Sequence, residues 1–246
     1  MLNYKIQGSG DVLLLIHGFG ISFIIWEDLL PKLVNNYTVI MIELPGIGLS
    51  HYLLNSEVNY YENAASEVQT LLQFLGVMKF SVIAYSLGAN VLSKYALHNK
   101  NLLNKVILLY PASFGKSRRL LLVGLQKLDE SFPSFINFII SGFSLYILIF
   151  KLGFNYKYEK KIRIWHDVIS LNNINVLKKS IFDLLQFDEL DYRDLFNETL
   201  IVWGKHDLLV NRFKTKYKVY LANGGHSGPV SHADSIIHVI HDFLKG

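Results

Sequence analysis

The sequence predicts an α/β protein whose mostly parallel sheet is flanked by helices and interrupted by an all-helical cap insertion. Two features of the chain carry this prediction. Several short runs are apolar throughout rather than alternating, which is typical of parallel strands covered on both faces. Segments with the periodicity of amphipathic helices fall between these runs, as in a doubly wound sheet. The principal runs are residues 12–16, 39–44, 81–85, 106–110 and 199–203.

The remaining elements follow from the same patterns. Residues 4–7 are expected to form a short edge strand and residues 218–221 the last strand. In the segment 60–75 apolar residues recur at helical spacing, and Gly76 is a typical helix stop. The other expected helices are residues 26–33, 89–98 and 231–244.

The alternation of strands and helices breaks between residues 113 and 190, where the pattern is helical and no strand-like run occurs. We therefore expect residues 1–112 and 191–246 to form the core and residues 113–190 to form a helical cap. Such an insertion between two strands is expected to cover the carboxyl ends of the sheet, where open α/β sheets bind their ligands.

The positive charge of the chain is concentrated in this cap. Residues 113–190 hold 11 Lys and Arg against 7 Asp and Glu, and this excess equals the net charge of +4 of the whole chain. A solvated surface accounts for scattered charge of this kind. The alternative is a docking surface for an acidic carrier protein or an anionic membrane. No nucleic-acid-recognition motif accompanies the charge, so nucleic acid is not an expected partner.

Residues 131–150 of the cap carry no charge over a length that just suffices for a membrane span. Pro133 and the pair Ser141-Gly142 would divide this stretch into two shorter helices. Three interpretations follow, namely a spanning helix, a segment at the membrane interface, or a buried cap around an apolar pocket. The helix breakers and the position inside an α/β fold favour the buried cap.

Composition limits the available chemistry. The chain has 246 residues, of which 51% are hydrophobic, and it contains no cysteine. Disulfides, thiolate metal sites and a cysteine nucleophile are therefore excluded. The first residues lack the apolar run and cleavage site of a signal peptide, so we expect a cytoplasmic protein.

The most informative motif is the serine that ends the run 81–85. Ser86 has Ala84 two positions before it and Gly88 two positions after it, and a helical segment follows. Such a strand–turn–helix presents a nucleophilic hydroxyl in a strained backbone conformation. The flanking residues must be small because the strand and the helix nearly touch. Ser86 is therefore the candidate nucleophile.

A glycine-rich turn, residues 17–20, follows the first long apolar run. It exposes backbone N–H groups at the edge of the sheet where the serine is expected. The N–H groups of Phe19 and of Leu87, the residue after the serine, are the candidate donors to a developing oxyanion. His17 is expected to brace this turn rather than to transfer protons.

Two further candidates follow later strands. Asp207 lies just past the run 199–203, where its carboxylate is expected to fix the tautomer of a histidine. His226 follows the last strand, and the glycines around it are expected to leave it exposed and mobile, as a general base requires. The chain order Ser86, Asp207, His226 is that of one class of hydrolases. This chemistry requires neither a metal nor a cofactor, and none is expected.

Five segments resemble, in the right order, motifs of the α/β-hydrolase-fold superfamily, and the chain resembles small serine carboxylesterases with a helical cap. The segments are residues 17–20, 43–50, 84–88, 203–207 and 225–226. The resemblance covers nearly the whole chain outside the cap. Two positions depart from the family pattern. Ala84 stands where glycine is usual, and Glu43 stands where aspartate usually precedes Pro-Gly.

The resemblance implies acyl chemistry. Haloalkane dehalogenases and epoxide hydrolases of this fold use aspartate at the position of Ser86. The expected activity is hydrolysis of small carboxylic esters or thioesters with an apolar acyl group, through an acyl-enzyme intermediate. The basic cap also resembles that of esterases that process acyl groups on acyl carrier protein. Two alternatives stay open: a carbon–carbon bond hydrolase or lyase like those of menaquinone synthesis, and a non-catalytic ligand-binding or membrane-peripheral protein.

Overall fold

The computed structural model describes residues 1–51, 57–113, 116–132, 134, 137–138, 172–187 and 198–246. Within these ranges one sheet contains the strands β1 (Tyr4–Gln7), β2 (Asp11–Ile16), β3 (Tyr37–Ile42), β4 (Phe80–Tyr85), β5 (Leu103–Leu109), β6 (Glu198–Gly204) and β7 (Lys218–Ala222). Their order is β1-β3-β2-β4-β5-β6-β7. β1 pairs with β3 in antiparallel fashion, and every other pair is parallel. The predicted α/β class with a mostly parallel sheet is confirmed.

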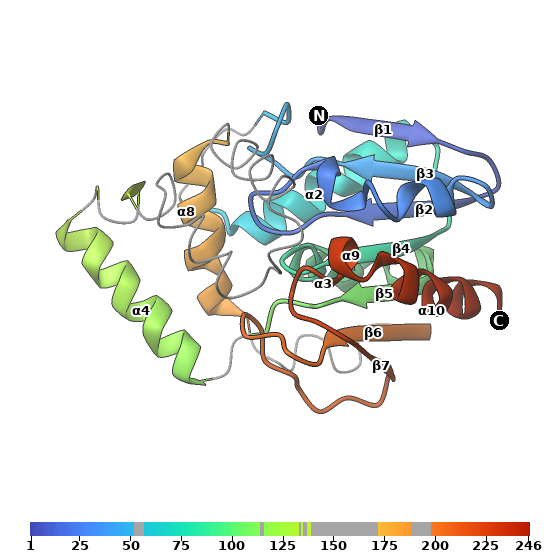
Figure 1. Cartoon of the computed structure of the whole chain (residues 1–246). Helices are drawn as coiled ribbons and strands as arrows, with labels where there is room; N and C mark the ends of the chain where they lie inside the picture. The colour runs from blue at the N-terminus through green and yellow to red at the C-terminus, as the bar shows by residue number, and fades with distance from the viewer. Residues whose placement is uncertain (52–56, 114–115, 133, 135–136, 139–171, 188–197) are drawn as a thin grey trace.

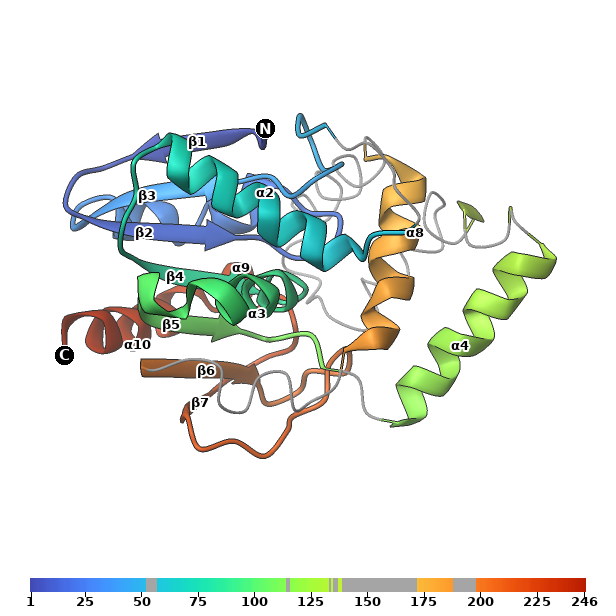
Figure 2. The same ribbon diagram turned by 180° about the vertical axis from the view of Figure 1, so that it is seen from behind.

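Helices cover both faces of this sheet, as Figures 1 and 2 show. Successive residues of β2 point to opposite faces, because side chains alternate along a strand. Leu14 and Ile16 pack with the helices α2 (Tyr60–Phe74) and α3 (Gly88–Asn99). Leu13 and Leu15 pack on the other face. That face is covered by the 3₁₀ helix η1 (Phe23–Trp26) and the helices α1 (Leu30–Leu33), α9 (Gly228–Ser231) and α10 (Ala233–Lys245).

Two predicted helices are wrong in their extent. The segment 26–33 contains two short pieces, because Pro31 lies in the first turn of α1 and its missing N–H can be tolerated only there. The predicted helix 231–244 begins later, at Ala233, because His232 has φ −136° and so interrupts the path between α9 and α10. The strand predicted at 106–110 ends at Leu109, since Tyr110 adopts φ 49°. The short 3₁₀ helix η2 (Lys100–Leu102) leads from α3 into this strand.

The described part of the predicted cap is helical. It consists of α4 (Lys116–Ser131), α8 (Ile174–Asp183) and the 3₁₀ helix η4 (Leu184–Gln186), which lie between β5 and β6 in the chain. Val176 and Leu177 of α8 are fully buried in the same cluster as α2 and α3. An ion pair of 2.6 Å between Asp129 and Lys178 joins α4 to α8. The limits at residues 113 and 190 border segments outside the described ranges, so the division into core and cap stays a prediction.

The anchor between α8 and the core is polar as well as apolar. The backbone N–H of Tyr60, at the start of α2, donates to Oδ2 of Asp183. The hydroxyl of Tyr61 donates to the carbonyl of Ser180 over 2.7 Å. Lys179 pairs with the same Asp183 carboxylate at 3.0 Å. A buried helix N-terminus needs an acceptor, and here the acceptor comes from the predicted cap.

Among the described residues, no helix has both the length and the apolar character that crossing a membrane requires. Most of the uncharged stretch 131–150 lies outside the described residues. The choice among its three interpretations therefore stays open.

Candidate active site

Ser86 occupies a sharp turn between β4 and α3. It is one of two non-glycine residues with positive φ in the described part of the chain, at φ 51°. Its backbone is held at both ends, because its N–H donates to the Leu109 carbonyl over 2.8 Å and its carbonyl accepts from the Ala112 N–H over 3.1 Å. The adjoining sheet thus over-determines a conformation that an isolated serine would avoid.

The close approach of strand and helix at this turn explains Gly88. A Cβ atom at Gly88 would lie 2.5 Å from the carbonyl oxygen of His17 and 2.7 Å from that of Ile16. No side chain fits at such distances, so position 88 requires glycine. Ala84 is fully buried, and its single methyl group is accommodated where the family usually has glycine. The sequence-based expectation of small residues around Ser86 agrees with this packing.

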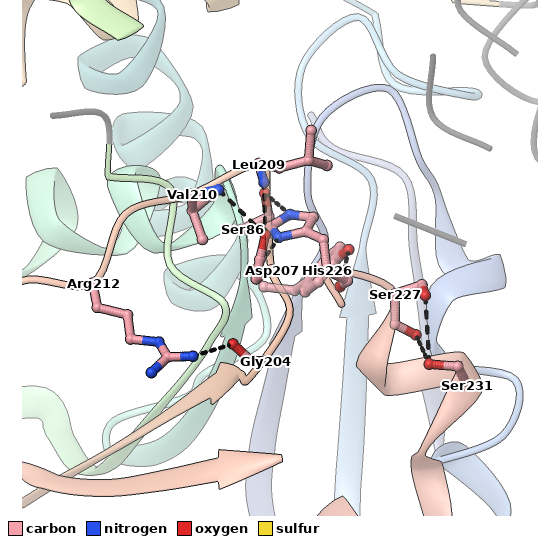
Figure 3. A network of polar contacts seen from close by, with 10 residues as sticks. Ser86, Gly204, Asp207, Leu209, Val210, Arg212, His226, Ser227 and Ser231 are labelled. Carbon is pink, nitrogen blue, oxygen red and sulfur yellow. Dashed lines mark hydrogen bonds and ion pairs between the residues drawn. The ribbon is translucent and has the colours of Figure 1, made fainter. Parts of the chain in front are cut away.

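The structure brings the three predicted polar side chains together (Figure 3). Nε2 of His226 lies 2.8 Å from Oγ of Ser86. Nδ1 of the same ring lies 2.8 Å from Oδ2 of Asp207. The three residues follow β4, β6 and β7, whose carboxyl ends meet at one edge of the sheet. A neutral imidazole with its proton on Nδ1 can therefore donate to the carboxylate and accept from the hydroxyl at the same time.

Asp207 is held as a carboxylate. Its side chain is 3% exposed, and burial alone would raise its pKa. The hydrogen bond and the charge interaction with His226, together with the amides of Leu209 and Val210, outweigh this effect and lower the pKa. Those amides donate to Oδ1 over 2.9 and 3.3 Å and leave Oδ2 to the imidazole. The carboxylate is thereby oriented as well as ionised.

The prediction that His226 is exposed is wrong, whereas its mobility stays a prediction. The residue is 7% exposed, and its ring packs beside two tyrosines, with centroid distances of 5.3 Å to Tyr85 and 5.8 Å to Tyr110. The Tyr85 hydroxyl also donates to the His226 carbonyl over 3.0 Å. The nearby glycines permit a close backbone contact instead, since a Cβ at Gly204 would lie 2.7 Å from the carbonyl oxygen of Gly224.

Neither tyrosine was identified from the sequence. Tyr85 lies inside the elbow motif, but at a position where the motif tolerates any residue. Tyr110 directly follows β5 with positive φ, and a strand end beside the nucleophile strand was the one local signal available. Burial, and then the charge of Asp207, raise the pKa of both hydroxyls above their usual value. Both tyrosines therefore stay neutral, and Tyr85 acts as a donor.

The glycine-rich turn at residues 17–20 abuts the elbow. A Cβ at Gly18 would lie 3.0 Å from the Cβ of Ser86. His17 is fully buried, its Nδ1 donates to the Gly18 carbonyl over 2.7 Å, and its Nε2 accepts from the Leu44 N–H over 2.9 Å. Burial lowers the pKa of His17 to about 4, so the ring is neutral. His17 braces the turn, as expected from the sequence.

The predicted oxyanion donors belong to these two adjoining segments. The Phe19 N–H lies in the glycine-rich turn, and the Leu87 N–H lies directly after Ser86 at the start of α3. Among the described residues, no protein acceptor takes a hydrogen bond from either amide. Neither amide is therefore engaged within this part of the chain, and its role as an oxyanion donor stays a prediction. The same part of the chain holds no group of three His, Asp or Glu side chains that could bind a metal ion.

Glu43 is one of the two positions at which the chain departs from the family motifs, and the structure explains its presence. Glu43 is buried, and its carboxylate accepts from the Asn3 side chain over 2.7 Å and from the Leu49 N–H over 2.8 Å. A Cβ at Gly48 would lie 2.3 Å from this carboxylate. Glu43 therefore folds the loop after β3 around itself and has a structural role.

An α/β sheet with a serine on a strained strand–helix turn, hydrogen-bonded to a histidine and through it to an aspartate, defines the class of hydrolases with a nucleophile elbow. The model of the family described as alpha/beta hydrolase fold matches residues 11–219 of this chain. The chain belongs to that family. The matched region contains Ser86 and Asp207 and ends shortly before His226.

Individual relatives agree with this membership. The chain is 23% identical to a pimeloyl-(acyl-carrier protein) methyl ester esterase of Aeromonas hydrophila, over 96% of each chain. It is 25% identical to a soluble epoxide hydrolase of a Corynebacterium species, over 73% of this chain but only 65% of that protein. An esterase from Exiguobacterium antarcticum superposes with a TM-score of 0.81 at 18% identity, over 100% of this chain and 96% of the other. The predicted resemblance to esterases of this fold is confirmed.

Proposed function

We propose that this chain is a serine hydrolase that cleaves carboxylic esters or thioesters with an apolar acyl group. The observation that carries the proposal is the continuous pair of 2.8 Å contacts from Ser86 through His226 to Asp207, on a turn whose backbone is held in place. The uncharged stretch 131–150 and the apolar content of the cap support an apolar acyl group.

In the proposed reaction His226 Nε2 takes the proton of Ser86 as Oγ attacks the acyl carbonyl. The carbonyl oxygen becomes an oxyanion that accepts from the N–H groups of Phe19 and Leu87. Asp207 stabilises the imidazolium, which then gives its proton to the leaving alkoxide or thiolate. A water molecule attacks the acyl enzyme by the same relay, releasing the acid and restoring the serine hydroxyl.

Ser86 also separates this proposal from the chemistry named for some relatives. A matched relative is an epoxide hydrolase and another is a fluoroacetate dehalogenase. Enzymes of these two kinds with this fold resemble one another in using an aspartate at the position of Ser86, whereas a serine hydroxyl needs a base to be activated. His226 lies within hydrogen-bonding distance to provide that base.

The test is active-site labelling with a fluorophosphonate, followed by turnover of p-nitrophenyl esters of increasing acyl length. The wild-type chain and a Ser235→Ala variant, which changes an exposed serine of α10, are expected to be labelled equally. Ser86→Ala is expected to lose labelling and to lose turnover by several orders of magnitude. Labelling that persists in Ser86→Ala would overturn the assignment.

We further propose that the acyl group is delivered on an acidic carrier protein that docks on the cap. The relative that matches this chain over 96% of its length is named for an ester on acyl carrier protein. The excess of four positive charges in residues 113–190 supplies the complementary charge. Two of these charges, Arg118 and Arg119, belong to α4, and two more, Lys160 and Lys161, lie outside the described residues.

A pair of charge-reversed double variants tests this docking. Arg118→Glu with Arg119→Glu is compared with Lys214→Glu and Lys245→Glu, which make the same charge change at exposed positions outside the cap. The first pair is expected to lower kcat/KM for a carrier-linked acyl ester and to spare small esters. This loss should shrink as salt rises. Equal effects of both pairs on both substrates would argue against a carrier.

A further inference from the structure

One side chain from the predicted cap bridges two loops of the core beside the candidate oxyanion site. Asn172 precedes α8, and its Nδ2 donates to the Gly20 carbonyl over 2.7 Å. Its Oδ1 accepts from the Gly48 N–H over 2.9 Å. The two partners lie 152 and 124 positions away in the chain. The side chain is half-buried, and both ends of its amide are used.

The orientation of this amide follows from its surroundings. The loop that contains Gly48 is held by Glu43, which accepts from the Leu49 N–H, and by the Ser50 hydroxyl, which donates to the Glu43 carbonyl over 2.6 Å. A backbone N–H at Gly48 requires an oxygen as its partner. The oxygen of Asn172 therefore faces Gly48, and its NH₂ group must face the Gly20 carbonyl.

The turn at residues 17–20 is thereby held from two sides. On the core side His17 Nδ1 donates to the Gly18 carbonyl, which belongs to the same peptide group as the Phe19 N–H. On the other side Asn172 holds the Gly20 carbonyl. Gly20 has φ 62° and no Cβ to limit its rotation. Without Asn172, one end of the turn would be free to change its peptide orientation.

The residues that follow Asn172 are also fixed to the core. The N–H of Asn173 donates to the Gly46 carbonyl over 3.4 Å, and Val176 is fully buried against Gly46. A Cβ at Gly46 would lie 2.7 Å from a methyl carbon of Val176, so the start of α8 packs directly on the backbone of this loop with no room for a side chain between them. Asn172 is therefore held next to a close-packed contact between Val176 and Gly46.

We propose that Asn172 is a positioning residue that sets the geometry of the oxyanion turn from the cap side. The inference rests on the proposed function, since it concerns the donor amide of Phe19. The position of a donor matters most in the transition state, when charge develops on the substrate oxygen. Loss of the Asn172 side chain should therefore slow the chemical step more than it weakens substrate binding.

Two isosteric variants one residue apart provide the test. Asn172→Asp keeps the acceptor for the Gly48 N–H but replaces the donor to Gly20 by an oxygen. Asn173→Asp introduces the same charge and keeps the helix cap, because Asp caps as well as Asn where the side chain accepts from the Asn175 N–H. We expect kcat for ester hydrolysis to fall about ten- to a hundredfold in Asn172→Asp, with KM within about twofold. Asn173→Asp should match the wild type.

A transition-state analogue adds a second readout. The inhibition constant of a trifluoromethyl ketone, whose oxyanion occupies the same place, should rise in Asn172→Asp by the factor lost from kcat. Asn172→Ala, which introduces no charge, should show the same loss and replaces Asn172→Asp if circular dichroism shows that variant to be unfolded. Equal kcat in the two Asp variants overturns the positioning role, and so does a rise in KM alone.

The two proposals fail in different ways. A wild-type chain that neither reacts with fluorophosphonate at Ser86 nor turns over esters overturns the proposed function, and this inference with it. An active wild-type chain whose Asn172→Asp variant keeps full kcat and full affinity for the ketone overturns the role of Asn172 alone.

Discussion

The nucleophile and the base of the candidate site are held by different means. Ser86 is fixed by close backbone contacts, since the His17 carbonyl stands 2.5 Å from where a Cβ of Gly88 would be. His226 is fixed by side chains, through Asp207 on one ring nitrogen and Tyr85 on its backbone carbonyl. Steric constraint cannot be relaxed by one conservative substitution, whereas a hydrogen bond can. The site therefore combines a rigid nucleophile with a base whose support can be removed one bond at a time.

The largest effect is expected from the charge-assisted contact between Asp207 and Nδ1 of His226. Asp207→Asn keeps the size of the side chain but presents an NH₂ group or a neutral oxygen to Nδ1 of His226, and so loses control of the tautomer. We expect kcat for ester hydrolysis to fall about 10⁴-fold, on the scale known for such changes in serine hydrolases. Asp242→Asn, at an exposed position of α10, is the control. Comparable kcat in the two variants would show that Asp207 does not orient the base.

A steric change at the elbow should act on stability as well as on activity. Gly88→Ala places a methyl group against two backbone carbonyls, and we expect the free energy of unfolding to fall by about 3 kcal/mol. The matched control is Gly124→Ala on α4, where nothing lies within 4 Å of the added Cβ. That variant should gain about 0.5 to 1 kcal/mol from helix propensity. Denaturant titration of both measures the difference, and equal shifts would contradict the steric account.

His17, which braces the glycine-rich turn at residues 17–20, should make the stability of the fold depend on pH. Burial lowers the pKa of His17 from 6.5 to about 4, so the unfolded chain takes up this proton at a higher pH than the folded chain. The free energy of unfolding should therefore fall as pH drops from about 6.5 towards 4, by roughly 3 kcal/mol from this group. Denaturant titrations at pH 7, 5.5 and 4 measure the slope.

The variant His17→Gln isolates this contribution. It should be less stable than the wild type at pH 7, because the bonds to Leu44 and Gly18 are altered, but its stability should change less with pH. An unchanged slope in this variant would assign the pH dependence to other groups.

The smallest expected effect separates the two tyrosines beside His226. Tyr85→Phe removes one hydrogen bond to the His226 carbonyl, worth about 1 kcal/mol, and should lower kcat by about five- to tenfold. Tyr110→Phe is the matched control, since its buried hydroxyl has no partner among the described residues. Steady-state kinetics should show the loss in the first variant and none in the second. The reverse order would mean that ring packing, not the hydrogen bond, positions the base.

The candidate site could be predicted from the sequence where each residue is marked by its own strand. Ser86, Asp207 and His226 each follow a predicted strand, and the carboxyl ends of parallel strands meet at one edge. The burial of His226 could not be predicted, because it depends on tyrosines from two other strands. Asn172 carried no local signal either, since its partners are more than a hundred residues away in the chain.

The fold shows the same division. Most strands were located within a few residues because continuous apolar runs mark them. The segment 26–33, in contrast, was taken for one helix although Pro31 lies in the first turn of a new one. β5 ends one residue before the predicted end, because Tyr110 has a positive φ. Only glycine would have indicated such a φ in the sequence. Apolar patterns indicate which residues are buried. They do not indicate the backbone angle of the one residue at which a helix or strand ends.

The acceptor that Asp183 offers to the Tyr60 amide makes the first turn of α2 depend on the position of α8. If α8 separated from the core, the first turn of α2 would lose that acceptor, and we expect that the Tyr60 amide would then exchange faster with solvent deuterium. Amides in the middle of α2 keep their helical partners during the same event and exchange only when the core itself opens. The exchange rate of the Tyr60 amide would therefore report the separation of α8 from the core.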